Sequence, residues 1–347
     1  MEFPQVLILE GDDENAAAEE LAQQIGAWGF GAPFVLASQH GSRLAARLEG
    51  PEAAGPPAPH ADQEWAIELG ARARRAGADA VVAVGGGRCL DIAKLAAARA
   101  GLPSIAVPTQ LSHDGICSPV AVVPDDSGRP ESVGAIAPRG VFIVMPTLLS
   151  APAASVRAGI GDLLANPLAL RDWALAAEHG LEETDQRAWD LSVESYQTIE
   201  PDLDRGPKDL AGDAGFLHRL ANALVLSGLA MIWSGTSRPA SGGEHEISHA
   251  IDELFGGRAM HGEQVAFGCI VSVALYGEDT DAFRARLKSL GLPESPRDLG
   301  LSAADVVRVL LHAPETRPGR FTIVEDANLD ETGARDLVNR VWGTQID

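Results

Sequence analysis

The feature that most constrains the fold of this chain is a regular alternation of apolar runs and helix-like stretches over its first 146 residues. The apolar runs are short and rich in Val, Ile and Ala, as buried strands are. Apolar strands separated by helices favour a parallel sheet that helices cover on both faces. We therefore predict a Rossmann-like α/β nucleotide-binding domain over residues 1–147. The predicted strands are 5–10, 33–37, 78–84, 104–107 and 141–145, and the predicted helices are 14–28, a stretch that ends near Glu49, 62–76 and 89–99.

Two segments interrupt this alternation. Residues 50–60 (GPEAAGPPAPH) hold too many prolines for a regular element, which predicts a loop. Residues 120–123 and 134–137 flank the turn-rich sequence DDSGRP, which indicates a β-hairpin. We therefore expect one long loop and one hairpin in addition to the parallel sheet.

The chain changes character after Leu148, where strand-like runs almost disappear and segments rich in Ala and Leu dominate. A length of 347 residues agrees with about two domains. The sequence thus predicts an all-helical, metal-binding domain over residues 148–347. Its predicted helices are 162–180, 186–200, 213–233, 244–254, 261–276, 281–290 and 302–313.

Charge and cysteine content exclude several classes of protein. The net charge is −22, which argues against binding nucleic acid through a basic surface and against a polybasic membrane contact. No uncharged apolar run approaches the ~20 residues of a membrane span, so we expect no stable membrane insertion. The three cysteines are scattered without a CxxC pair, which fits reduced thiols and a cytoplasmic location.

Three consecutive glycines, Gly85, Gly86 and Gly87, connect a predicted strand to a predicted helix within the sequence VGGGRCLDIAK. In this geometry backbone N–H groups and a helix N-terminus face an anion such as a phosphate. The spacing differs from the GxGxxG dinucleotide fingerprint, and a tight turn without a ligand is the alternative. Asp91 and Lys94 follow three residues apart on the predicted helix. A surface ion pair would explain them without any ligand.

Two further polar segments lie near predicted element ends. The sequence VPTQLSHDGICSP (107–119) directly follows a strand, so it lies at the carboxyl edge of the sheet, where ligands bind in such folds. A solvated turn would have a similar composition. In AGIGDLLAN (158–166), Asp162 precedes an apolar helical run, so capping of the 162–180 helix explains it without any ligand.

Three of the nine histidines fall within 17 residues. His245 and His249 are four apart, which places them on one face of a helix, and His261 begins the next helical stretch. Two histidines and one carboxylate with an open fourth position are typical of catalytic zinc. Asp162 is an available carboxylate. We predict a divalent metal here, Zn²⁺ first, although nitrogen and oxygen ligands also suit Fe²⁺ or Ni²⁺.

These segments together resemble the glycerol-1-phosphate dehydrogenase family, part of the metal-dependent alcohol dehydrogenase and dehydroquinate synthase-like superfamily. The resemblance runs in the same order from about residue 80 to 330. It rests on GGGRCLDIAK, PTQLSHDGICSP, GIGDLLAN, SRPASGGEHEISHAID, MHGEQVAFG and RPGRFTIVED. It implies a two-domain, cytoplasmic, NAD(P)H-dependent oxidoreductase of phospholipid biosynthesis that interconverts dihydroxyacetone phosphate and sn-glycerol 1-phosphate. We expect a homo-oligomer.

The resemblance also implies roles for individual residues. Asp162, His245 and His261 match metal ligands. Asp114 and His249 match positions that contact substrate, which makes them the candidate catalytic residues, with Asp162 beside them. The matching cofactor positions, added to Gly85 and Gly86 of the glycine loop, are Gly87, Arg88, Cys89, Leu90, Asp91, Thr109, Gln110, Leu111, Ser112 and Ser118.

The chain departs from the family pattern at Arg88-Cys89, where a Lys and a small apolar residue are more usual, and at Asn166-Pro167. Substrate identity is therefore less secure than reaction class. A related dehydrogenase of another small phosphate, phosphonate or polyol stays open, as do a dehydroquinate synthase-like cyclase and a metal-bound regulatory protein without activity.

Two predictions concern anionic groups. The end of the second strand, ASQHGSR (37–43), lacks the acidic residue that usually accepts the ribose 2′-hydroxyl of NAD. We therefore expect NADPH to be used at least as well as NADH, with Ser38 or Arg43 near the 2′-phosphate. A substrate phosphate needs local positive charge, and Arg238 is the first candidate, followed by Arg317 or Arg320.

Overall fold

The computed structural model describes residues 3–55, 57, 61–125 and 128–343. Its centre is a six-stranded sheet in which every neighbouring pair of strands is parallel. The strand order is β1 (Gln5–Leu9), β8 (Gly140–Val144), β5 (Ser104–Pro108), β4 (Ala80–Gly85), β2 (Pro33–Ala37) and β3 (Ala53–Ala54). The parallel sheet that the apolar runs predict is confirmed.

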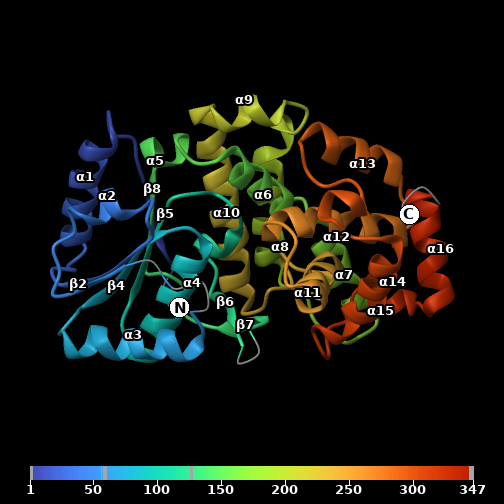
Figure 1. Ribbon diagram of the computed structural model, residues 1–347, viewed down its shortest axis with the longest axis horizontal. Coiled ribbons are helices and arrows are strands. Elements are labelled where there is room, and N and C mark those ends of the chain that lie inside the picture. The colour runs from blue at the N-terminus through green and yellow to red at the C-terminus, as the bar shows by residue number, and fades with distance from the viewer. Residues whose placement is uncertain (1–2, 56, 58–60, 126–127, 344–347) are drawn as a thin grey trace.

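Helices cover both faces of this sheet (Figure 1). Successive side chains of a strand point to opposite faces, so Val82 and Val84 pack into one hydrophobic cluster while Val81 and Ala83 pack into another. The first cluster includes α1 (Glu14–Ala27) and α2 (Ser42–Ala45), and the second includes α3 (Gln63–Arg75) and α4 (Gly87–Ala100). Burial on both faces explains why these strands are continuous apolar runs.

Three local predictions in this part need correction. The helix expected to end near Glu49 is the short α2, which ends at Ala45. The proline-rich segment expected as a loop contains the two-residue strand β3. The hairpin exists, but its strands are β6 (Val120–Pro124) and β7 (Pro130–Gly134) rather than 120–123 and 134–137. Arg129 O accepts a hydrogen bond from Asp125 N at 2.7 Å next to the paired Pro124 and Pro130, so the second strand begins earlier than expected.

The rest of the described chain is helical, as predicted. The expected helix 162–180 instead covers the end of one helix and all of the next, with a two-residue turn at Leu164 and Ala165 between them. Asp162 therefore lies in the last turn of the first helix, and the expectation that it caps a helix N-terminus is wrong. The α-helices are α5 (Met145–Leu149), α6 (Ala153–Leu163), α7 (Asn166–Glu178), α8 (Gln186–Ile199), α9 (Pro207–Ala211), α10 (Ala214–Ser234), α11 (Gly243–Phe255), α12 (His261–Leu275), α13 (Thr280–Ser289), α14 (Ala303–His312), α15 (Ile323–Ala327) and α16 (Glu331–Trp342).

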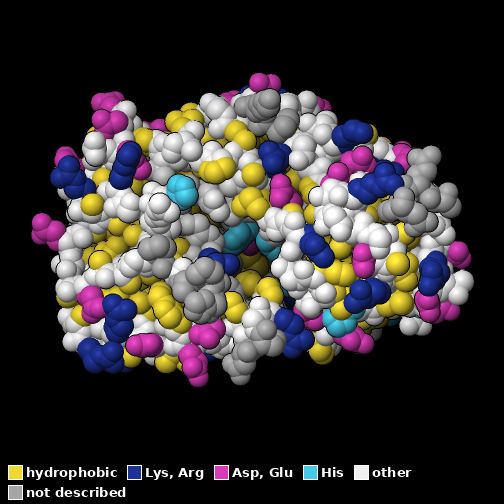
Figure 2. Space-filling model, viewed as in Figure 1, with side chains coloured by type: hydrophobic (Ala, Val, Ile, Leu, Met, Phe, Trp, Pro, Cys, Tyr) yellow, Lys and Arg dark blue, Asp and Glu magenta, His cyan; other side chains and the backbone are white. Residues whose placement is uncertain are grey.

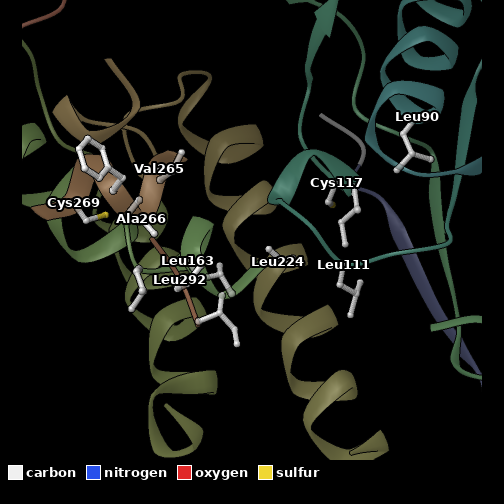
Figure 3. Packing of buried hydrophobic residues seen from close by; sticks show 14 of the residues in the cluster. Leu90, Leu111, Cys117, Leu163, Leu224, Val265, Ala266, Cys269 and Leu292 are labelled. Atoms are coloured by element: carbon white, nitrogen blue, oxygen red, sulfur yellow. The ribbon is translucent and has the colours of Figure 1, made fainter. Parts of the chain in front are cut away.

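One hydrophobic cluster runs from the sheet into the helices. Leu90 of α4, Leu224 of α10 and Val265 of α12 all belong to it (Figure 3). Among the described residues, α10 alone has the length and hydropathy of a membrane-spanning helix, and most of it is buried inside the protein. We refer below to residues 3–149 as the α/β part and to residues 153–343 as the helical part. The domain boundary at 147/148 stays a prediction.

Candidate active site

Three helices bring the predicted metal ligands together. Asp162 comes from the end of α6, His245 from the first turn of α11 and His261 from the first residue of α12. One ligand atom from each residue lies within 4.8 Å of the others. Asp162 Oδ1 is 3.7 Å from His245 Nε2 and 3.7 Å from His261 Nε2. Two nitrogens and one oxygen thus converge on one point.

A close helix crossing sets this geometry. A Cβ atom at Gly161 would clash with the carbonyl oxygen of Gly262, and a Cβ atom at Gly262 would clash with that of Ala158. Because both positions are glycine, α6 and α12 approach closely where they cross. His261 therefore lies beside Asp162, although 98 positions separate them in the sequence.

The Asp162 carboxylate has one oxygen engaged and one free. Oδ2 accepts a hydrogen bond from the Asp114 N–H at 2.8 Å, whereas the buried Oδ1 has no hydrogen-bond partner. Burial acts to raise the pKa of Asp162, but the nearby imidazole of His245 and the charges of the surrounding histidines lower it. A buried anionic oxygen without a donor, facing two imidazoles, suits a divalent cation.

The two candidate ligand histidines differ in their surroundings. Burial lowers the pKa of His261 to about 3, so its imidazole is neutral, as a metal ligand must be. Burial also acts to lower the pKa of His245, but Asp162 and Glu244 raise it to about 9. Binding of a cation beside His245 would therefore release a proton.

A cavity of about 370 Å³ opens next to this cluster. Figure 2 shows a hollow near the middle of the molecule with histidine side chains at its bottom. The α/β part contributes Asp114, Ser118 and the β6–β7 hairpin, and the helical part contributes His249 and Arg317. The predicted polar segment and the histidine helices thus face one space.

Sequence reasoning missed several residues that line this cavity. His113 lies next to Asp114 in a segment that was singled out, and its ring is 6.0 Å from that of His261. Its position next to Asp114, a candidate catalytic residue, was the one sequence feature that could have indicated it. The others, which no spacing marks, include Val122, Ser132, Ser237, Ser241 and Asp252.

Asp114 and His249 are buried titratable groups at the cavity. Asp114 Oδ2 accepts a hydrogen bond from Ser227 Oγ at 2.8 Å, and burial, followed by the charge of Asp162, raises the pKa of its carboxyl to about 7. His249 Nε2 accepts a hydrogen bond from Arg317 at 2.8 Å. Burial and the charge of Arg317 lower the pKa of His249 well below its usual value. His249 is therefore neutral, with its proton on Nδ1.

The glycine loop has the predicted strand–loop–helix form. No side chain caps the N-terminus of α4, so the first N–H groups of the helix are open to a ligand. A Cβ at Gly86 would lie 2.8 Å from Gln110 Nε2, and one at Gly87 would clash with His113 Nε2. The loop thus needs glycines to approach these two side chains.

Two more cavities adjoin the glycine loop. One of about 520 Å³ is lined by Gly86, Thr109 and Gln110 and by Ser38 and Arg43 at the end of β2. A second of about 190 Å³ is lined by Gly87, Arg88, Asp91 and His113. The second shares Asp91 and His113 with the cavity at the histidines. Together the three surround the carboxyl ends of β2, β4 and β5.

Several expected cofactor residues do not face these cavities. The side chains of Cys89, Leu90 and Leu111 are buried in the hydrophobic core, and burial raises the pKa of the Cys89 thiol to about 12. Gly85 and Ser112 are also buried and line none of the three. Any contact that the three core residues make with a cofactor would come from their backbone atoms.

The Asp91–Lys94 pair is buried, which corrects the alternative of a surface ion pair. Lys94 Nζ lies 2.9 Å from Asp91 Oδ1 and donates a hydrogen bond to the carbonyl of Gly115 at 2.9 Å. It also donates to the carbonyl of Val120. Lys94 therefore ties the segment that carries Asp114 to α4.

Arg238 is not placed to bind a substrate phosphate. Its Nε donates to the Glu182 carboxylate at 2.8 Å and its NH1 to the Phe321 carbonyl at 2.8 Å. It does not line the cavity, whereas Arg317 does. Of these two arginines, only Arg317 lies at the site.

Comparisons with known proteins identify the class of enzyme to which this fold and site are similar. Residues 37–152 match the family described as iron-containing alcohol dehydrogenase. The fold is similar to a probable glycerol dehydrogenase of Sinorhizobium meliloti, with a TM-score of 0.80, 21% identity, and coverage of 98% of this chain and 96% of that one. It is also similar to glycerol dehydrogenase of Schizosaccharomyces pombe, with a TM-score of 0.74, 20% identity, and coverage of 97% and 89%.

Sequence relatives narrow this class. Glycerol-1-phosphate dehydrogenase [NAD(P)+] of Cenarchaeum symbiosum is 37% identical over 262 residues, which is 76% of this chain and 72% of the relative. The enzyme of that name from Hyperthermus butylicus is 38% identical over 266 residues, or 76% and 74%. The chain belongs to the glycerol-1-phosphate dehydrogenase family.

Proposed function

We propose that this protein is a metal-dependent NAD(P)H oxidoreductase that interconverts dihydroxyacetone phosphate and sn-glycerol 1-phosphate. The observation that carries the proposal is one cavity in which the Asp162, His245 and His261 cluster lies close to a single arginine, Arg317. The sequence relatives are named glycerol-1-phosphate dehydrogenase, which supports this choice of substrate.

Asp162, His245 and His261 would hold the divalent metal, for which zinc is our first expectation and Fe²⁺ or Ni²⁺ the alternatives. The partnerless Asp162 Oδ1 supports this assignment. When bound, the ion acts as a Lewis acid that stabilises negative charge on the substrate oxygen. The chain orients the ion by fixing Asp162 Oδ2 to the Asp114 N–H, which leaves Oδ1 for the metal.

The glycine loop and the uncapped start of α4 would bind the cofactor pyrophosphate through backbone N–H groups. The nicotinamide supplies the hydride. The cavity at the end of β2 would take the adenosine ribose, with Ser38 and Arg43 at its wall. Glu14 also lines this cavity and lies 3.5 Å from Arg43. Because residues 37–43 themselves contain no carboxylate, we expect NADPH to serve at least as well as NADH.

Arg317 would bind the substrate phosphate. It is the only lysine or arginine among the described residues that line the histidine cavity, and its NH1 donates to Ser241 Oγ at 2.7 Å. In a chain with a net charge of −22, such a local cation is what attracts a dianion. The planar fork of arginine suits a phosphate group.

Asp114 would exchange the substrate proton, and His249 would hydrogen-bond the substrate oxygen. A carboxyl with a pKa of about 7 can take or release a proton near neutral pH, and Asp114 borders the cavity. Neutral His249, whose Nε2 accepts from Arg317, presents its Nδ1–H as a donor. The hydrogen bond thus couples the residue that binds phosphate to a residue that can donate a hydrogen bond to the substrate oxygen.

Steady-state kinetics test this proposal. We expect kcat/KM for dihydroxyacetone phosphate, with either NADH or NADPH, to exceed that for dihydroxyacetone by at least tenfold, as loss of a charge-assisted hydrogen bond of about 1.5–3 kcal/mol predicts. Equal efficiency on both ketones would refute the phosphate and favour a dehydrogenase of another small substrate. Absence of net NAD(P)H consumption would favour the cyclase. A strong preference for NADH would contradict the expected cofactor use.

A further inference from the structure

We infer that Glu244 is the positioning residue of the metal site, the buried carboxylate that orients His245 and fixes which of its ring nitrogens is free to bind a cation. The inference rests on the proposed metal site. Glu244 matches no expected ligand or cofactor contact, yet its side chain is fully buried next to a candidate ligand.

The two nitrogens of His245 face two different carboxylates. Nδ1 is 3.0 Å from Glu244 Oε1, and Nε2 is 3.7 Å from Asp162 Oδ1. Because a carboxylate at Nδ1 accepts a hydrogen bond, the proton of neutral His245 belongs on Nδ1. The lone pair on Nε2 is then directed at Asp162 and His261, where the cation would bind.

Glu244 is itself held in place. Gly242 N–H donates to Glu244 Oε1 at 2.6 Å, and Gly243 N–H donates to Asp172 Oδ2 at 2.7 Å. Asp172 also accepts from Tyr276 Oη at 2.6 Å. A Cβ at Gly242 would clash with Asp172 Oδ2 and lie 3.0 Å from Glu244 Oε2. The glycine therefore allows both carboxylates to reach the start of α11.

This arrangement affects the cation in two ways. A carboxylate behind a ligand histidine fixes its tautomer and ring orientation and makes the imidazole a stronger base. It also adds a negative charge: a divalent cation with Asp162 alone leaves a net charge of +1, and Glu244 brings the buried site to neutrality. Losing Glu244 should therefore weaken metal binding by about 10–100-fold.

A purely structural role for Glu244 is the competing explanation, because its carboxylate also binds an N–H at the start of α11. Glu246 provides a matched control. It lies on the same helix and is also fully buried, but its carboxylate accepts from Thr322 Oγ1 at 2.9 Å. Glu246 has no hydrogen bond with His245 among the described contacts.

The test compares metal affinity in the full-length chain and in Glu244→Ala, Glu244→Gln and Glu246→Gln. Each protein is stripped of metal and titrated with Zn²⁺ and with Co²⁺ against a competing chelator, and Tm is measured without metal. We expect Glu244→Ala to raise the Kd about 10–100-fold. Glu244→Gln keeps an oxygen for Nδ1–H and loses only the charge, so we expect a smaller rise, below about tenfold. Glu246→Gln should stay within about twofold of the unchanged chain.

Each outcome has a defined meaning. Equal Kd values for Glu244→Ala and the unchanged chain would overturn the inference. So would a loss of affinity in Glu246→Gln as large as that in Glu244→Ala, because burial alone would then explain it. If Glu244→Ala fails to fold, Glu244→Gln decides, and a Kd equal to that of Glu246→Gln would refute the inference. If the unchanged chain binds neither ion, the proposed metal site falls, and the inference falls with it.

Discussion

The glycine loop of the α/β part and the histidine cluster of the helical part meet the cavities with different kinds of atoms. In the α/β part the glycine loop offers backbone N–H groups, while Cys89, Leu90 and Leu111 direct their side chains into the core. In the helical part the site consists of single side-chain atoms, such as Asp162 Oδ1. A backbone surface tolerates changes at side chains that point into the core, such as that of Cys89. A side-chain site should lose its function when one atom is removed.

The ligand histidines should give the largest effect. We expect His245→Ala and His261→Ala to lose both bound metal and activity, by about a thousandfold or more, because metal stabilisation of the substrate oxygen supplies several kcal/mol. Elemental analysis and kcat measure both. His249→Ala should retain metal and lose rate only. Full metal occupancy in both ligand variants would require another site.

Arg317 tests the helical part at a second point. Arg317→Ala should reduce the preference for dihydroxyacetone phosphate over dihydroxyacetone by tenfold or more, because a charge-assisted hydrogen bond contributes about 1.5–3 kcal/mol. The ratio of the two kcat/KM values measures it. Arg238→Ala is the matched control, since Arg238 is paired with Glu182 and should leave that ratio unchanged. A fall in the ratio only for Arg238→Ala would reverse our assignment.

The glycine loop tests the α/β part. In Gly87→Ala the new methyl group would clash with His113 Nε2, so either the His113 ring or the loop with its N–H groups must shift, and both border the proposed cofactor site. We expect KM for NAD(P)H to rise about tenfold, equivalent to one lost charge-assisted hydrogen bond, with metal content unchanged. Loss of bound metal in this variant would show instead that the glycine loop and the metal site do not act independently.

The buried Asp172 gives the smallest effect, on stability. Burial, followed by the charge of Glu244, raises the pKa of its carboxyl from 3.8 to about 7. The folded protein thus holds this proton at pH values where the unfolded chain has lost it. The stabilisation is complete below the unfolded pKa and is lost as pH rises to about 7.

We therefore expect Tm to fall between about pH 4 and pH 7, and to fall less in Asp172→Asn by a few degrees, about the shift that 1 kcal/mol produces. The comparison uses the change with pH, because the asparagine also alters the hydrogen bond from Gly243. Identical pH dependence in the two proteins would contradict the raised pKa.

Sequence patterns predicted regular elements well and side-chain direction poorly. Periodicity places α11 and α12 within one or two residues, since helices of that length have clear apolar faces. It could not reveal the turn at Leu164 and Ala165, which a continuous run of apolar residues conceals, so helix capping by Asp162 stayed open as an alternative to metal binding. Nor could it show that Arg238 turns to Glu182, because the partner lies 56 positions away.

The three candidate ligands, which the structure brings together, were predictable because two of them share a short stretch of sequence and a family pattern supplied the third. Glu244 was not, although it is adjacent to His245. A glutamate in the first turn of a helix is ordinary in sequence. Only burial and the distance to Nδ1 distinguish it from a solvated residue.

The crossing of α6 and α12 at Gly161 and Gly262 also bears on how this site can diversify. The Asp162–His261 spacing is set where two helices touch, so the lengths of the connecting loops do not enter into it. Insertions between α7 and α11 could reshape the cavity mouth while the ligand spacing stays fixed. New substrates could then be acquired by changing the rim, without rebuilding the metal centre.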